Sequence, residues 1–98
     1  MAESFKLKKP VTFEEVKYEA LTLDFDKLTG NDILNAETQY RVEQPDASNV
    51  LVKELTKGYQ AYVVARAADV PVELVRNLSA SDFTRLTVQA QSFLLGMG

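Results

Sequence analysis

Apolar and polar residues alternate along the first quarter of the chain. Phe5 and Leu7 alternate with lysines until Pro10, and a second alternating run begins at Val16. One apolar residue in every two is typical of a strand with one buried face. The pattern therefore predicts a β-hairpin over about residues 4–25, in which the residues between Pro10 and Val16 connect the two strands.

The second run changes phase at Ala20 and Leu21, where two consecutive residues would both have to face inward. Two structures produce such a change: a β-bulge, or a strand that passes from one face of the sheet to the other. A two-stranded hairpin on its own is only marginally stable in water. Its apolar face must therefore pack on the segments that follow.

Beyond the hairpin, apolar residues recur every three or four positions, which is the period of an amphipathic helix. In the first of these segments they are Ile33, Ala36 and Tyr40. The pattern predicts helices over about residues 30–43, 48–68, 71–77 and 80–96. We therefore expect the α+β class, with an N-terminal β-hairpin packed on a small bundle of about four α-helices.

Two segments carry the residues that favour a helix N-terminus. Thr29 precedes Asp32 by three positions, and Ser79 precedes Asp82 by the same spacing. A hydroxyl at the N-cap accepts a hydrogen bond from a free backbone N–H, and a carboxylate in the first turn accepts another. Pro71 fits the first turn of the third helix, where an N–H would have no partner in any case.

Gly58 lies in the apolar stripe of the second predicted helix, between Leu55 and Tyr59. A glycine in a helix interior costs about 1 kcal/mol relative to alanine. Either the missing side chain lets another helix approach closely, or the glycine is a tolerated imperfection.

Length and composition describe one ordinary globular domain. The chain has 98 residues, of which 46% are apolar and 26% are charged, so we expect a single domain over residues 1–98. It contains no His and no Cys. Zinc sites built from Cys and His, Cys nucleophiles, Ser-His triads and disulfide frameworks are therefore excluded.

The carboxylates offer little chemistry of their own. Asp24 and Asp26 stand at alternate positions, as the first ligands of a calcium loop do. In that loop, however, Leu28 would take the position of the third ligand, Thr29 that of the required glycine and Asn35 that of the closing glutamate. The glycines form neither phosphate-binding motif. We expect no enzyme, and no catalytic, cofactor-binding or metal-binding residue.

Charge and hydropathy argue against two further classes of ligand. Eleven basic residues stand against fourteen acidic ones, a formal net charge of -3, and the cluster Lys6, Lys8 and Lys9 has no aromatic residue between its members. The longest apolar run, residues 61–65, is far shorter than the ~20 residues that span a bilayer. We expect a cytoplasmic protein that binds neither nucleic acid nor membrane.

The acidic residues concentrate around the first helix. Residues 21–49 contain six acidic and two basic residues, a local net charge of -4. This region either steers a basic partner surface or is a solvated polar face. Asp32 and Glu37 are therefore candidate partner-binding residues.

A second apolar ridge is predicted on the last helix. Val88 and Leu95 are seven positions apart, away from the stripe of Phe83 and Leu86, and on the second helix Val64 lies among polar residues. Such positions mark a face for a partner or for self-association, or else a core that wraps the last helix on two sides. We take as further candidate partner-binding residues Val64, Val88 and Leu95.

The order and spacing of five short segments resemble one family. The segments are Leu7–Val11, Tyr18–Leu23, Gly30–Ile33, Ala67–Pro71 and Leu78–Asp82, followed by Phe93 and Leu94. Together they cover nearly the whole chain and resemble the small tail assembly chaperones of Mu-like, contractile-tailed bacteriophages.

The resemblance implies a chaperone in the host cytoplasm that is absent from the mature virion. Such a protein keeps the long, apolar, helical tape measure protein soluble and helps to recruit tail tube subunits. Members of the family are often also made in a C-terminally extended form by a ribosomal frameshift. The alternative hypothesis is a structural component of the phage tail or virion, or a small cytoplasmic regulator that acts as a fixed oligomer.

Overall fold

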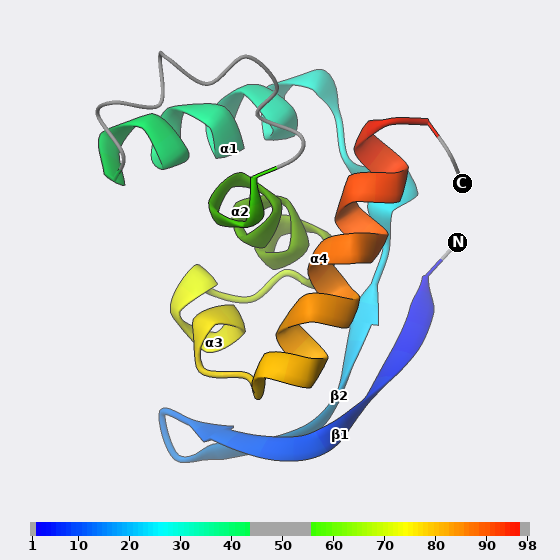
Figure 1. Cartoon of the computed structure of the whole chain (residues 1–98), viewed down its shortest axis with the longest axis vertical. Helices are drawn as coiled ribbons and strands as arrows, with labels where there is room; N and C mark the ends of the chain where they lie inside the picture. The colour runs from blue at the N-terminus through cyan, green and yellow to red at the C-terminus, as the bar shows by residue number, and fades with distance from the viewer. Residues whose placement is uncertain (1, 44–55, 97–98) are drawn as a thin grey trace.

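The computed structural model consists of a long N-terminal hairpin followed by helices (Figure 1). It describes residues 2–43 and 56–96. The hairpin is formed by β1 (Glu3–Phe13) and β2 (Val16–Leu23), and a short 3-10 helix, η1 (Phe25–Lys27), follows it. The remaining elements are α1 (Gly30–Glu43), α2 (Lys57–Ala68), α3 (Val72–Arg76) and α4 (Ala80–Leu94). The predicted α+β class, a hairpin packed with four helices, is confirmed.

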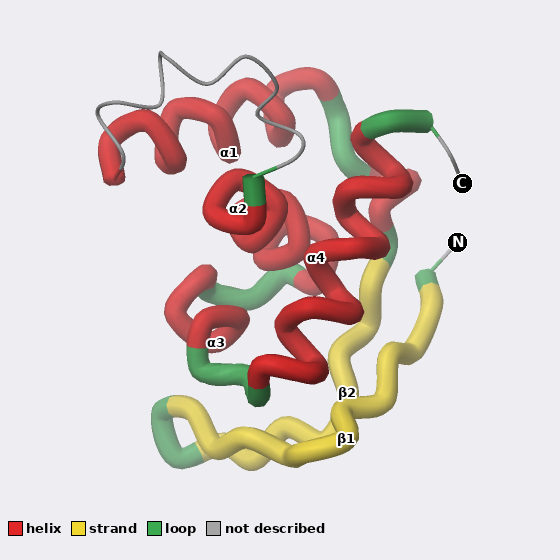
Figure 2. Tube along the Cα trace, viewed as in Figure 1, coloured by secondary structure: helices red, strands yellow, loops and turns green. Residues whose placement is uncertain are grey.

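Helix α2 is the centre of the molecule. It packs against α1, α3, α4 and β2, while the hairpin curves along one side of the helices and β1 contacts α4 (Figure 2). Eight of the twelve residues of α2 are buried, because neighbours surround the helix on several sides. The buried apolar residues of all the elements form one core.

The two strands pair antiparallel in two different registers. Phe5 lies opposite Leu21, whereas Val11 lies opposite Tyr18, so β1 contains three more residues than β2 between these pairs. Side chains alternate between the two faces of a strand. A register shift by an odd number of residues therefore exchanges the residues of the partner strand that face inward with those that face outward. The irregularity in β1 therefore accounts for the change in the apolar phase of β2 between Ala20 and Leu21. It lies in β1, between Lys6 and Val11, and not in the second run, where the sequence placed a bulge or a change of face.

Strand β1 does not end at Pro10, as the sequence had predicted, but continues to Phe13. Proline has no N–H to donate, and Pro10 lies in the stretch of β1 where the regular pairing is interrupted. Only Glu14 and Glu15 connect the strands, with φ angles of 51° and 68°. Both values are left-handed, as a two-residue type I′ turn requires.

The helices start close to where the local signals place them. Helix α1 coincides with the segment predicted over residues 30–43, and Thr29 and Asp32 form the predicted reciprocal cap, with bonds of 2.9 and 3.3 Å. Helices α3 and α4 begin within a residue of their predicted starts. Helix α2 begins at Lys57 after an extended Thr56, so the prediction of helix at that residue is wrong. The rest of its predicted N-terminal part, residues 48–55, lies outside the described residues.

Gly58 of α2 lies directly against a side chain of α1. A Cβ atom at this position would lie 2.7 Å from Cε1 of Tyr40. The Tyr40 ring is buried and meets the ring of Tyr59 edge-on, with centroids 6.1 Å apart. The missing side chain therefore lets Tyr40 of α1 pack directly on the backbone of α2.

Candidate partner-binding surface

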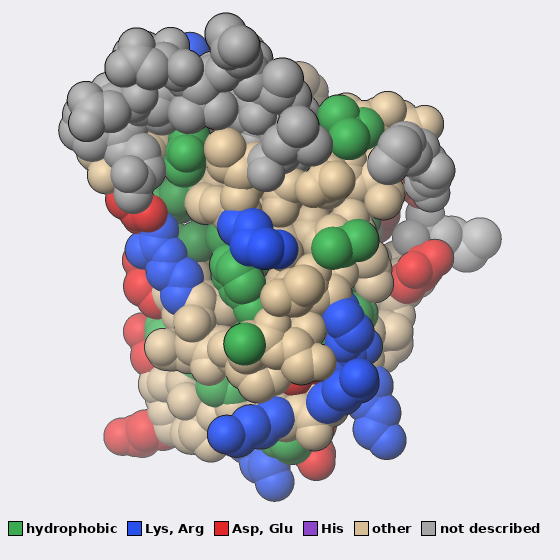
Figure 3. Space-filling model, viewed as in Figure 1, with side chains coloured by type: hydrophobic (Ala, Val, Ile, Leu, Met, Phe, Trp, Pro, Cys, Tyr) green, Lys and Arg blue, Asp and Glu red, His purple; other side chains and the backbone are tan. Residues whose placement is uncertain are grey.

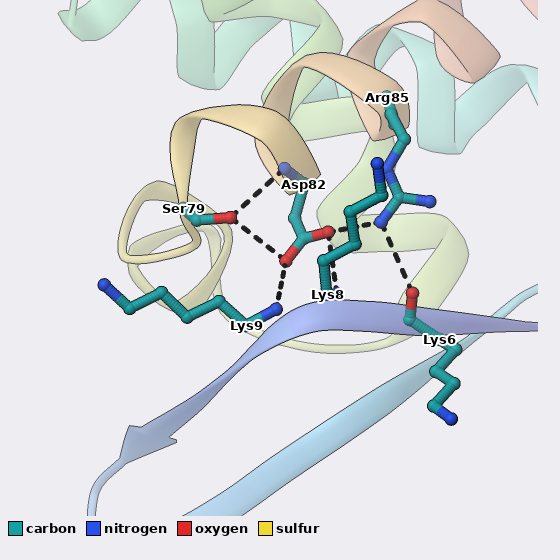
Figure 4. Close-up of polar contacts among 6 residues, drawn as sticks. All are labelled: Lys6, Lys8, Lys9, Ser79, Asp82 and Arg85. Carbon is teal, nitrogen blue, oxygen red and sulfur yellow. Dashed lines mark hydrogen bonds and ion pairs between the residues drawn. The ribbon is translucent and has the colours of Figure 1, made fainter.

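The carboxylate of Asp82 holds the start of α4 against the hairpin (Figure 4). Its side chain is fully buried, and it accepts hydrogen bonds from the backbone N–H groups of Lys8 (3.0 Å) and Lys9 (3.1 Å). Both residues belong to the irregular stretch of β1. Arg85 forms an ion pair with the same carboxylate, and the Ser79 hydroxyl donates to it at 3.1 Å. We call this set of contacts the Asp82 clasp.

The clasp favours the ionised carboxylate. Burial alone would raise the pKa of Asp82, but the hydrogen bonds from Lys8 and Lys9, and then from Arg85 and Ser79, outweigh it and lower the pKa from 3.8 to about 2. The Arg85 guanidinium also lies over the ring of Phe5, 4.4 Å from its centroid. The position of α4 relative to the strands is therefore fixed by a buried, charged contact.

An open groove lies between α4 and the end of β2, and apolar and polar residues line it in equal number. The polar ones are Glu3, Asp26, Gln89 and Ser92. Its volume is about 340 Å³, with Val88 and Phe93 of α4 on one side and Leu23 and Phe25 on the other. The rings of Phe25 and Phe93 stack, with centroids 5.2 Å apart. We call this the α4 groove, and its lining suits an apolar side chain of a partner.

The predicted apolar residues lie in different environments. Val88 lines the α4 groove and is 50% exposed, whereas Leu95, just after the end of α4, is 41% exposed and lies outside the lining. Val64 is fully buried, so its predicted place on an exposed face is wrong. The neighbouring Gln60 is also buried and bonds Gln91 of α4 at 3.0 Å. Two of the polar residues that suggested exposure, Lys57 and Gln60, thus contact α4.

The two candidate acidic residues both have partners within the chain. Asp32 lies 3.4 Å from Arg66, and the backbone hydrogen bond from Thr29 is the main cause that lowers the pKa of Asp32. Glu37 pairs with Arg41, one turn further along α1, at 2.7 Å. Neither residue lines the α4 groove, and their contact with a partner stays a prediction.

Comparison with known families identifies the chain. The family model described as phage tail assembly chaperone proteins, E, or 41 or 14 matches residues 4–95. The chain belongs to this family of tail assembly chaperones. No curated protein and no solved structure matches it. The match spans both strands and the described helices of the chaperone, and so includes the clasp and the α4 groove.

The chaperone carries further exposed apolar residues that the sequence analysis did not single out. Leu34 and Val42 on α1 are 60% and 77% exposed. Their separation of eight positions places them on the same side of the helix, so a helical wheel drawn from the sequence could have identified them. On the face shown in Figure 3, apolar side chains form separate small patches rather than one continuous surface. The contact between Phe25 and Phe93 could not be predicted from a helical wheel, because the two residues are far apart in sequence and meet only in the folded chain.

The described residues of the chaperone contain neither a metal-binding cluster nor a membrane-spanning helix. Residues 2–43 and 56–96 contain no group of three or more acidic side chains that could hold a metal ion. Within the same ranges, none of the helices has the length and apolar character needed to cross a bilayer.

Proposed function

We propose that this protein is a non-enzymatic chaperone that binds and solubilises the tape measure protein during phage tail assembly. It acts in the host cytoplasm, helps to recruit tail tube subunits around that protein, and does not remain in the mature virion. The family match over residues 4–95 carries the proposal. Chaperoning of this kind needs apolar contact area rather than a catalytic centre.

The α4 groove supports the proposal. Its volume of about 340 Å³ is within the usual range for ligand pockets, about 300–1,000 Å³. Burying one large aliphatic side chain there stabilises a complex by about 1.5–3 kcal/mol. Val88 lies in the groove and Leu95 lies beyond the end of α4, and both are exposed. A helical segment of a partner could contact both residues.

Co-expression with the tape measure protein encoded by the same phage or prophage tests the proposal. The wild-type chain should keep that protein in the soluble fraction and co-purify with it, whereas the tape measure protein alone should precipitate. The double variant Val88→Glu and Leu95→Glu should retain its helical circular dichroism but lose most of the co-purification. The matched control is Val16→Glu with Leu34→Glu, which changes one exposed valine and one exposed leucine elsewhere.

Three results would contradict the proposal or its site. A tape measure protein that is equally soluble alone would remove the need for a chaperone. Equal loss of binding in the test and control variants would show that the α4 groove is not the specific contact. Detection of the chain in purified mature particles would favour the alternative, a structural component of the tail.

A further inference from the structure

A second and larger groove lies on another side of the molecule. It is bounded by the C-terminal part of α1, the end of α2 and the connection between α2 and α3, and its volume is about 630 Å³. We call it the α1–α3 groove. It shares no lining residue with the α4 groove. A molecule that occupies one groove therefore leaves the lining of the other free.

The walls of the α1–α3 groove are rich in apolar side chains. Val42 projects from α1 and is 77% exposed, although a valine gains stability from burial. On the opposite side, Val70 and Val72 are half-buried and Pro71 between them is exposed. Tyr62 of α2 also lines the groove. Bulky apolar side chains of a partner could thus bury surface that the described part of this chain leaves exposed.

The charges at the rim of this groove are unevenly paired. Arg66 contacts Asp32 and Gln39, and Arg76 contacts Glu43 and Tyr62, so both cations are already engaged. By contrast, the exposed carboxylates of Asp69 and Glu73 form no ion pair with another described residue. Both acidic and basic side chains are visible along the edge of the molecule beside α1 and α3 (Figure 3). The rim therefore presents uncompensated negative charge next to an apolar wall.

We propose that the α1–α3 groove binds an amphipathic helix of a partner protein, whose apolar face is flanked by Lys or Arg. The apolar residues of that helix lie against Val42 and the Val70–Val72 wall, and its cations lie near Asp69 and Glu73. A groove between helices is a common docking site for such a segment. The inference goes beyond the proposed function, because it gives the chain a second binding surface besides the α4 groove.

Two synthetic peptides test the inference on the full chain by NMR titration. One is an amphipathic helix of Leu, Ala and Lys, and the other has Glu in place of every Lys. The Lys peptide should shift the amide signals of residues 38–42, 69–70 and 72–73, and the Glu peptide should bind at least about tenfold more weakly. The variant Asp69→Asn with Glu73→Gln should weaken the binding of the Lys peptide by about tenfold, because it removes two exposed ion-pair partners of the peptide.

The choice of variants keeps the test specific. Asn tolerates the left-handed backbone of Asp69 (φ 57°), so the end of α2 should stay intact in the double variant. The variant Glu15→Gln with Glu19→Gln, which removes two exposed carboxylates of the hairpin outside both grooves, serves as the control and should bind the Lys peptide as the wild type does. The inference is overturned if both peptides bind equally, if the rim variant has wild-type affinity, or if the shifted signals belong to the α4 groove.

Discussion

Replacing Asp82 by Ala removes the acceptor of two backbone N–H groups and the counter-charge of Arg85. A buried donor left without an acceptor costs about 1–3 kcal/mol, and breaking a buried ion pair costs about 3–5 kcal/mol. The Arg85 side chain is 36% exposed, so water can solvate it in part. Because these costs arise in one network and do not add, we expect Asp82→Ala to lower the free energy of unfolding by about 3–4 kcal/mol, near the lower end of the cost of the ion pair alone.

The charge of Asp82 can be tested separately from its shape. Asp82→Asn keeps one oxygen acceptor but cannot ionise. It should lower the free energy of unfolding by about 2 kcal/mol at neutral pH. Because the folded pKa of about 2 lies below the ordinary 3.8, the ionised carboxylate stabilises the fold fully above about pH 4. That contribution disappears as the pH falls toward 2, so the wild type should lose more stability over this interval than the Asn variant.

Urea unfolding followed by far-UV circular dichroism measures both effects. Glu19→Gln, which changes an exposed carboxylate on β2, is the matched control and should unfold like the wild type. If Asp82→Ala lowered the free energy of unfolding by less than about 1 kcal/mol, as an ordinary surface substitution does, the clasp would not be a main contributor to stability. An Asn variant with the full acid dependence of the wild type would show that another group causes it.

Two further predictions concern the backbone. Gly58→Ala should lower the free energy of unfolding in urea by about 1–3 kcal/mol, because its Cβ would overlap the ring of Tyr40 and overpacking outweighs the better helix propensity; a variant at least as stable as the wild type would contradict this. Replacing Glu14 and Glu15 by Asn and Gly should raise stability by about 1–2 kcal/mol, because these residues suit left-handed φ values. An unchanged thermal midpoint would show that the turn carries no strain.

Features set by residues close in sequence could be predicted. The start of α1 follows from Thr29 and Asp32, three positions apart, and the start of α4 follows from Ser79 in the same way. The close approach at Gly58 was one of two interpretations, because the sequence does not show which ring faces a glycine. The alternation around Phe5 and Leu7 identified the first strand, since it reports a buried face directly.

Features set by distant residues could not be predicted. The phase change in β2 was visible at Leu21, but its cause is the extra residues in β1, and only the pairing of the strands reveals it. Val64 was placed at the surface because its helix neighbours are polar, yet α2 is enclosed by other elements. The α4 groove depends on Phe25 and Phe93, which are far apart in the chain and stack only after folding.

The Asp82 clasp also has a consequence for biosynthesis. Lys8 and Lys9 are made 74 and 73 residues before Asp82. Until then, two N–H groups in the irregular stretch of β1 lack the acceptor that they have in the finished fold. The nascent hairpin therefore lacks these contacts until α4 has been made, and we expect the domain to close as a unit after that point rather than strand by strand.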